Sequence, residues 1–327
     1  MKIFGIGFSG FIGGNVASQL IAEGHSLTGL ARSEASADSL RKLGVIPIKG
    51  SIADATIVHN AAKEADGAVL LSTGGFLKEA VGKGNDYNDC IEAILSAFEG
   101  TGKPFMQLGG IGLWMGRPEA TQGVLDEKVP FSTSTYYAEM LPGFHAVQNS
   151  GSRGVRAFML IPGQVYGRQG GHIGPLPRLF EDFRRNGAIH CLWPSSMSGI
   201  GTFTHIDDLG SAIVLGLQKA EAGKRYVVAT DNCDRLSICR MVSRVCGLQG
   251  RLTFVDEPTM EKQCGWTGPL HFKLGLVASS AKIRDELGWK PEGRGVLDEL
   301  QKLIDDKADV SIIYVERGHG QKLGKTE

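Results

Sequence analysis

Gly7-Phe8-Ser9-Gly10-Phe11-Ile12-Gly13 lies between a short apolar run, Ile3 to Ile6, and a segment whose apolar residues recur at three- and four-residue spacing. The order is therefore strand, glycine turn and helix, the geometry of a dinucleotide clamp. Glycines let a pyrophosphate approach the backbone closely, and the helix N-terminus supplies N–H donors. The pattern predicts that these seven residues bind a nucleotide cofactor, although glycines at this spacing also mark ordinary structural turns.

The next apolar run, Ser26 to Ala31, predicts a second strand, followed by Arg32 and Ser33. In NAD-binding versions of this unit, an acidic residue about 20 residues after the glycines holds the ribose hydroxyls. A nearby arginine instead accommodates the 2′-phosphate of NADP. Arg32, with Ser33 beside it, therefore favours NADP over NAD. Glu34 keeps NAD open as the less favoured cofactor, and a solvated strand end is the non-functional interpretation of Arg32.

Helix and strand patterns then alternate as a parallel sheet requires. Further helices are expected at 36–43, 53–64, 87–98 and 136–149, the last containing Pro142, and strands at 45–49, 68–71, 104–108 and 155–161. The predicted fold class is α/β, a Rossmann-type, doubly wound parallel sheet. Because ligands lie at the carboxyl ends of such strands, Ser72 and Thr73 are predicted to contact the cofactor.

The last third of the chain loses this regular alternation. We expect residues 1–165 to form the dinucleotide-binding Rossmann domain, with 201–230 returning to it. Residues 166–200 and 231–305 are expected to build a small C-terminal substrate lid, and 306–327 a C-terminal tail. Single cores stop growing at about 250–300 residues, so a chain of 327 residues suits a main domain with a smaller partner.

Composition argues against several classes of partner. Lys+Arg and Asp+Glu each number 35, and no basic stripe indicates nucleic acid or an anionic membrane. The six cysteines show no C-x-x-C pair and no His/Cys cluster at metal-ligand spacing, so we expect reduced thiols and no metal. The first strand begins at Lys2, and no apolar run approaches about 18 residues. We therefore expect a cytoplasmic protein with a small-molecule substrate.

Five motifs in order resemble the extended or atypical short-chain dehydrogenase/reductase superfamily, the NAD-dependent epimerase/dehydratases. They are the glycines Gly7, Gly10 and Gly13; Leu30-Ala31-Arg32-Ser33; Pro162-Gly163-Gln164-Val165-Tyr166-Gly167; Phe203-Thr204-His205-Ile206-Asp207-Asp208-Leu209; and Leu287-Gly288-Trp289-Lys290-Pro291. The resemblance covers about residues 1–305 and implies a Rossmann sheet with a C-terminal lid. It also implies cofactor contacts at Pro162 and Val165, and a homodimer through the helices at 87–98 and 136–149.

The same resemblance implies a catalytic group of a Ser or Thr, a Tyr, and a Lys four residues after the Tyr. The Tyr exchanges a proton with a substrate oxygen while a hydride moves to or from nicotinamide, and the Lys lowers the pKa of the Tyr. Here Gly109 stands at the hydroxyl position, Tyr136 at the tyrosine position and Met140 at the lysine position. Alignment on Tyr137 instead places Leu141 there. Tyr136 remains the predicted catalytic residue, as a proton donor without its lysine.

Other side chains could replace the two missing members. They are the hydroxyls of Ser132, Thr133, Ser134 and Thr135, the imidazoles of His145, His172 and His205, and the carboxylate of Glu139. Each has an ordinary alternative, because loop histidines are commonly solvated and a helix carboxylate commonly faces water.

Three functions follow from these observations. The first is an NADP-dependent oxidoreductase, a reductase or dehydrogenase, that acts on a small carbonyl or alcohol metabolite with Tyr136 as proton donor. The second is a redox-silent isomerase, dehydratase or cyclase on the same fold, favoured by the joint loss of hydroxyl and lysine. The third is a non-enzymatic NADP-sensing binding protein, which the fold alone permits.

Overall fold

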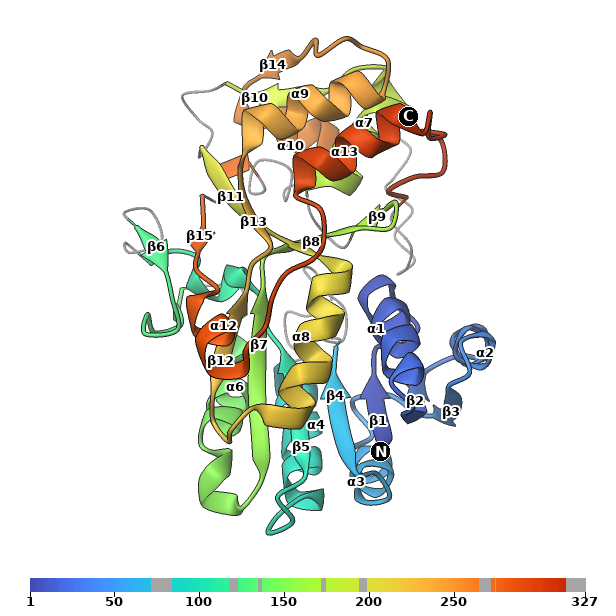
Figure 1. Cartoon of the computed structure of the whole chain (residues 1–327), viewed down its shortest axis with the longest axis vertical. Helices are drawn as coiled ribbons and strands as arrows, with labels where there is room; N and C mark the ends of the chain where they lie inside the picture. Colours follow the sequence, from blue (N-terminus) through green and yellow to red (C-terminus); the bar gives the residue numbers. More distant parts are fainter. Residues whose placement is uncertain are drawn as a thin grey trace.

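The computed structural model describes residues 1–71, 84–117, 123–134, 137–171, 175–193, 199–264, 272–273 and 275–315. Its centre is a seven-stranded sheet in the order β12-β7-β5-β4-β1-β2-β3, parallel at every pairing (Figure 1). The strands are β1 (Lys2–Ile6), β2 (Ser26–Ala31), β3 (Ile46–Lys49), β4 (Gly67–Leu70), β5 (Pro104–Leu108), β7 (Arg156–Pro162) and β12 (Arg225–Val228). The predicted Rossmann-type fold is confirmed, with its switch point between β1 and β4.

Helices cover both faces of this sheet (Figure 1). One face carries α1 (Phe11–Ala22), α2 (Glu34–Lys42), α8 (Ile206–Lys219) and α12 (Ala281–Leu287). The other carries α3 (Ala55–Lys63), α4 (Gly84–Ala97) and α6 (Leu141–Gln148). Successive residues of each central strand divide between the two faces, as Phe105 and Met106 do in β5. The strands are apolar throughout because both of their faces are buried.

A smaller region lies beyond the carboxyl ends of the main sheet (Figure 1). It contains α7 (Pro175–Asn186), β10 (His190–Leu192), α9 (Arg235–Val245), β14 (Thr253–Val255), α10 (Glu257–Cys264) and α13 (Val296–Asp305). These elements share an apolar cluster of their own, which includes Phe180, Ile238, Met260 and Leu300. Ile313 and Tyr314, from the segment expected to be a tail, are buried in the same cluster.

Short elements join the two regions. A four-stranded sheet has the order β13-β11-β8-β9, and a further strand pair joins β15 to β6. Their bounds are β13 (Asp231–Asp234), β11 (Ile200–His205), β8 (Gln164–Gly167), β9 (Gly170–Gly171), β15 (Val277–Ala278) and β6 (Val124–Leu125). Single 3₁₀ turns are η1 (Ile111–Trp114), η2 (Ala138–Met140) and η3 (Ser150–Arg153).

The segment 136–149 differs from the expectation of one helix interrupted by a proline. Among its described residues, η2 is followed by α6, and Pro142 lies in the first turn of α6. The missing N–H of a first-turn proline would have no partner within the helix in any case. Pro142 therefore helps to start α6, and the interior-proline cost of about 3 kcal/mol does not arise.

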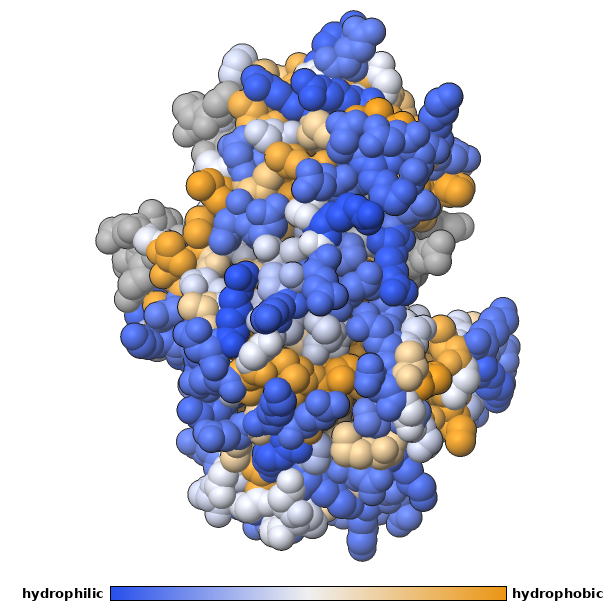
Figure 2. All heavy atoms as spheres, viewed as in Figure 1, coloured by the Kyte–Doolittle hydropathy of each residue, from blue (hydrophilic) through white to orange (hydrophobic). Residues whose placement is uncertain are grey.

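The surface and the far end of the sheet are polar. Figure 2 shows mostly hydrophilic residues on one face of the molecule, with apolar residues in separate patches.

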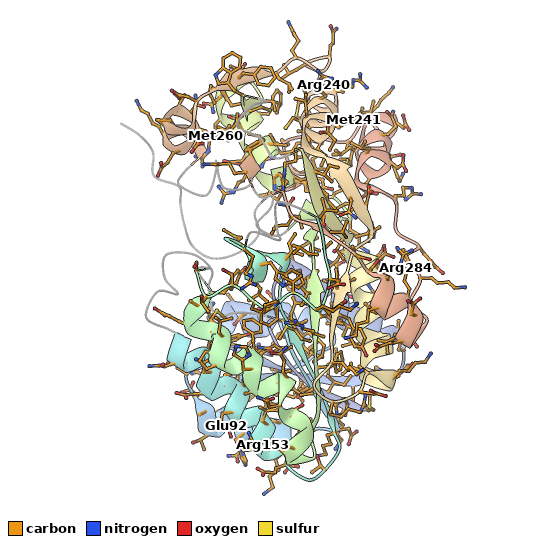
Figure 3. All side chains as sticks on the ribbon, turned by 90° about the vertical axis from the view of Figure 1, so that its left-hand side faces the viewer. Glu92, Arg153, Arg240, Met241, Met260 and Arg284 are labelled. Atoms are coloured by element: carbon orange, nitrogen blue, oxygen red, sulfur yellow. The ribbon has the colours of Figure 1, made fainter. Side chains whose placement is uncertain are left out.

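At the end of the sheet distant from the smaller region, Arg153 lies beside Glu92 (Figure 3), with 2.8 Å between Nη1 and Oε2. Within the described ranges, no helix combines the length and apolarity needed to cross a membrane.

Candidate functional site

The glycine turn joins the carboxyl end of β1 to the N-terminus of α1. Gly7 has φ 101°, a left-handed conformation that favours glycine. Gly13 packs directly on this turn, since a Cβ built there would lie 1.9 Å from the Gly7 carbonyl oxygen. The backbone itself therefore requires glycine at both positions.

Gly10 differs because the protein leaves room beside it. It is exposed, and a built Cβ would meet only the Gly7 carbonyl oxygen, at an ordinary contact distance of 3.5 Å. Gly10 is also the N-cap of α1, which has no capping side chain and no acidic residue in its first turn. A glycine that folding does not require, at an uncapped helix start, fits the close approach of a pyrophosphate.

Three polar residues follow β2, and two of them are already engaged. Ser33 caps α2, its Oγ accepting from the Ser36 N–H at 3.2 Å. Glu34 is ion-paired with Arg41, with 2.7 Å between Oε1 and Nη1. Arg32 is exposed and makes no ion pair or side-chain hydrogen bond with any residue that the structure describes. An anion bound at this strand end would therefore meet the guanidinium of Arg32.

Other residues selected from the sequence lie outside the described ranges or are buried. Ser72, Thr73 and the catalytic candidate Tyr136 lie outside the described residues. Pro162 ends β7 and is buried, and Val165 packs in the cluster beneath α1 at 7% exposure. Cofactor contacts at Ser72, Thr73, Pro162 and Val165, and the catalytic role of Tyr136, stay predictions.

Sequence reasoning did not single out the residues that follow β3. Gly50 donates its N–H to the Ala31 carbonyl at 3.0 Å, so this strand end lies beside that of β2. The Ser51 N–H and the Asp54 carboxylate then close a turn at 2.7 Å. The strand-end rule that selected Ser72 would also have selected Ser51.

The end of β5 shows where a catalytic hydroxyl could project. The Gly109 N–H donates to the Leu160 carbonyl at 2.7 Å, and a built Cβ at Gly109 would lie 3.1 Å from Leu113 Cδ1 and 3.4 Å from Met159 Sδ. Gly110 has an extended backbone, and nothing lies within 4 Å of its built Cβ. The open direction is therefore at Gly110, one residue after the position identified from the sequence.

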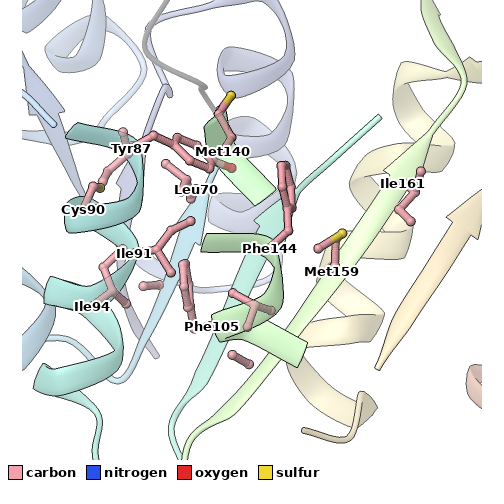
Figure 4. Close-up of a cluster of buried hydrophobic side chains, with 14 of the residues drawn as sticks. Leu70, Tyr87, Cys90, Ile91, Ile94, Phe105, Met140, Phe144, Met159 and Ile161 are labelled. Carbon is pink, nitrogen blue, oxygen red and sulfur yellow. The ribbon is translucent and has the colours of Figure 1, made fainter. Parts of the chain in front are cut away.

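The lysine position is part of the core. Met140 is 7% exposed and belongs to the cluster that contains Leu70, Tyr87 and Phe144 (Figure 4). Burial raises the pKa of Tyr87, whose hydroxyl accepts from Gln107 Nε2 at 3.0 Å. An apolar thioether thus occupies the position, and the phenol beside it stays neutral.

The side chains named above as possible replacements for the missing hydroxyl and lysine do not gather around Met140 in the described part of the chain. Ser132 is 2% exposed, and its Oγ accepts from the Ser134 N–H at 3.2 Å. Thr133, Ser134, Glu139 and His145 are exposed. Thr135 and His172 lie outside the described residues.

His205 has a structural role. It is 6% exposed and caps α8, with its Nδ1 accepting from the Asp207 N–H at 3.2 Å. Its ring meets the Tyr166 ring edge-on, with 5.3 Å between centroids. A buried, capping imidazole matches the ordinary interpretation of this histidine.

Comparison with known proteins defines the class. Residues 3–229 match the family described as the NAD dependent epimerase/dehydratase family. The match spans more than half of the chain, so the chain belongs to the NAD-dependent epimerase/dehydratase family. This confirms the resemblance to extended short-chain dehydrogenase/reductases.

Similar proteins extend this match over nearly the whole chain. An uncharacterised protein of Saccharomyces cerevisiae is 27% identical over 316 residues, covering 92% of this chain and 98% of that protein. A UDP-glucose 4-epimerase of Corynebacterium glutamicum is 23% identical over 342 residues, covering 98% and 99%.

Two solved structures share the fold. One is a UDP-glucuronic acid 4-epimerase from Bacillus cereus with UDP-glucuronic acid and NAD, which has a TM-score of 0.75 at 17% identity and covers 94% of this chain and 99% of that one. The other is a dTDP-glucose 4,6-dehydratase from Bacillus anthracis with NAD, with a TM-score of 0.72 at 15% identity, covering 94% and 97%. At these identities the likeness establishes the fold alone.

Proposed function

We propose that this protein is an NADP(H)-dependent oxidoreductase that reduces a small carbonyl metabolite. The observation that carries the proposal is the exposed guanidinium of Arg32 at the end of β2, which makes no ion pair with the residues that the structure describes. Glu34, the acidic residue that could have held ribose hydroxyls, is ion-paired with Arg41 instead. A 2′-phosphate would therefore find a cation here, while Glu34, the one carboxylate among residues 32–34, is held in an ion pair.

When bound, NADPH would supply the hydride. The chain's own part is to hold and orient the cofactor: Gly10 leaves room for the pyrophosphate, the start of α1 donates N–H groups, and Arg32 holds the 2′-phosphate. The smaller region, which lies beyond the carboxyl ends of the strands, is the proposed substrate lid.

Met140 favours reduction over oxidation. Oxidising an alcohol requires a base to remove the hydroxyl proton, and a phenol with a pKa of about 10 is ionised in only about one molecule in a thousand at pH 7. A nearby cation would lower that pKa, but Met140 carries no charge and lies in the apolar core. Reducing a carbonyl instead requires an acid. A neutral phenol can donate the proton, and we assign this role to Tyr136.

A nucleotide-sugar isomerase or dehydratase is the second candidate. It is favoured by the similarity to the UDP-glucose 4-epimerase over 98% of this chain. It also requires neither net consumption of cofactor nor a 2′-phosphate, and this separates the two candidates experimentally.

The cofactor choice is tested by titrating the wild type and Arg32→Ala with NADPH and with NADH. Charge-assisted contacts to phosphate are about twice as strong as neutral ones, so Arg32→Ala should bind NADPH about 10- to 100-fold more weakly and NADH equally well. A wild type that prefers NADH, or an equal loss for both cofactors, would overturn the NADP assignment.

The reaction is tested by following reduced nicotinamide absorbance against a panel of carbonyl compounds. Tyr136→Phe should lower turnover about 100-fold or more while NADPH affinity stays unchanged. Turnover of a nucleotide sugar without net cofactor consumption would establish the isomerase or dehydratase instead. Tight NADPH binding with no turnover on either panel would favour the NADP-sensing alternative.

A further inference from the structure

The hairpin between β8 and β9 contains an unusual turn. Tyr166 pairs with Gly171 and Gly167 with Gly170, so Arg168 and Gln169 alone form the tip. Both have left-handed backbones, with φ 50° and φ 58°. Tight hairpins with this geometry normally use Asn and Gly, because other side chains are strained there. A turn of this kind persists only when surrounding contacts hold it.

Two such contacts reach the tip from distant parts of the chain. Arg168 Nε lies 2.7 Å from Asp207 Oδ1 at the start of α8. The N–H of Tyr314 donates to the Gln169 carbonyl at 2.7 Å. The turn is thus held from one side by an ion pair and from the other by the segment 309–315.

That segment is firmly anchored on the smaller region. Tyr314 is fully buried, and its ring stacks on Phe180 of α7 with 5.1 Å between centroids and 3° between planes. Arg184, also on α7, donates to the carbonyls of Val310 at 3.2 Å and Ile313 at 3.1 Å. Tyr314 is therefore a fixed point against which the hairpin rests.

The other side of the hairpin rests on the glycine clamp. A Cβ built at Gly170 would lie 2.4 Å from Cε2 of Phe11, so the Gly170 backbone packs against that ring. Phe11 is the first residue of α1 and directly follows Gly10. In Figure 1, β9 lies beyond the N-terminal end of α1. A continuous set of contacts therefore runs from Tyr314 through Gln169 and Gly170 to Phe11.

We propose that Tyr314 is a positioning residue for the dinucleotide clamp. It holds the strained turn in place, the turn holds Gly170 against Phe11, and Phe11 fixes the start of α1 where the pyrophosphate binds. This inference rests on the proposed nucleotide-binding function. Its consequence is that affinity for the pyrophosphate part of the cofactor depends on residues 309–315, while affinity for the 2′-phosphate at Arg32 does not.

The test compares Tyr314→Ala with Tyr314→Phe, which keeps the ring stack. The probes are NADPH and 2′-AMP, a fragment that carries the 2′-phosphate but no pyrophosphate. Tyr314→Ala should weaken NADPH binding about tenfold and 2′-AMP binding less than about twofold, whereas Tyr314→Phe should match the wild type for both. A folded Tyr314→Ala protein with unchanged NADPH affinity, or with equal losses for both probes, would overturn the inference.

Two further variants separate positioning from general damage to the smaller region. Arg168→Ala removes the ion pair with Asp207 without touching the buried cluster. It should show the same selectivity with a smaller NADPH loss, about two- to fivefold, because both partners are half-exposed. Gln169→Gly relieves the left-handed strain, so adding it to Tyr314→Ala should restore part of the NADPH affinity. An Arg168→Ala protein with wild-type NADPH affinity would overturn the positioning role of Tyr314 but leave the proposed nucleotide-binding function standing. A wild type that binds neither probe would overturn the proposed function as well.

Discussion

At the carboxyl edge of the main sheet, the side formed by β1 and β2 differs from the side formed by β5 and α6 in how its residues are packed. On the β1–β2 side, two features that folding does not require are present: room beside Gly10 and, at Arg32, an exposed cation that forms no ion pair with the described residues. On the β5–α6 side, apolar packing has taken over, with Met140 in the core and no hydroxyl at Gly109 or Gly110. If the proposed function holds, the residues that bind the cofactor and those that transfer the proton occupy separate parts of this fold.

The largest effect is expected at Gly13, where Gly13→Ala would place a methyl group 1.9 Å from the Gly7 carbonyl oxygen. The turn or α1 must shift, so we expect the free energy of unfolding to fall by about 3 kcal/mol or more and NADPH binding to be lost. Denaturant unfolding and NADPH fluorescence measure the two quantities.

Gly10→Ala is the matched control for that variant. Its methyl group meets no obstacle in the protein, so the free energy of unfolding should change by less than about 1 kcal/mol. NADPH affinity should nevertheless fall at least about tenfold, since the methyl group enters the pyrophosphate space. Normal NADPH binding by Gly10→Ala would contradict the placement of the cofactor at this turn.

On the other side, restoring the family's lysine with Met140→Lys should destabilise the protein by about 3 kcal/mol, because an ammonium group would enter an apolar cluster. Burial would lower the pKa of the new lysine in the folded state. The penalty should therefore be complete at pH values below that lowered pKa, and stability should recover as the pH rises above it.

Met140→Leu is the control, with an expected loss below about 1.5 kcal/mol. Denaturant unfolding over a range of pH distinguishes the two variants. A stable Met140→Lys protein with enhanced turnover would show that the position still faces the reaction site.

Gly109→Ser and Gly110→Ser test which of the two glycines after β5 leaves room for a hydroxyl side chain. Gly109→Ser crowds Leu113 and Met159 and should cost about 1–2 kcal/mol, whereas Gly110→Ser projects into open space and should cost less than about 0.5 kcal/mol. Thermal unfolding of the pair checks this order. A reversed order would mean that the hydroxyl position is Gly109 after all.

Among these variants, the smallest effect on NADPH affinity is expected at Ser33. Ser33→Ala removes the cap of α2 and should lower the free energy of unfolding by about 1 kcal/mol. Because the hydroxyl is engaged in the cap, NADPH affinity should change by less than about twofold. A tenfold loss on titration would instead show that Ser33 also contacts the 2′-phosphate.

The N-terminal half was predictable because its signals are local. Glycine spacing and strand alternation are read from neighbouring residues, and they are enough to predict the parallel, doubly wound sheet. Met140 was different, since its burial depends on Tyr87 and Phe144, which come from separate helices. The start of α6 at Leu141 likewise follows from how Pro142 fits the first turn. Sequence spacing could identify that the lysine position holds Met140, but it could not show that this side chain packs in an apolar cluster.

The contact between Tyr314 and the hairpin that supports Phe11 also has a consequence for biosynthesis. The ribosome synthesises Phe11 early, and it synthesises Tyr314 only after most of the described chain. At about 5–20 residues per second, the interval is on the order of tens of seconds. The glycine turn can form its local hydrogen bonds during that time, but until Tyr314 is made the hairpin lacks the hydrogen bond from the Tyr314 N–H to the Gln169 carbonyl. The nascent protein would therefore acquire full cofactor affinity only after the segment 309–315 has been synthesised and has packed on the smaller region.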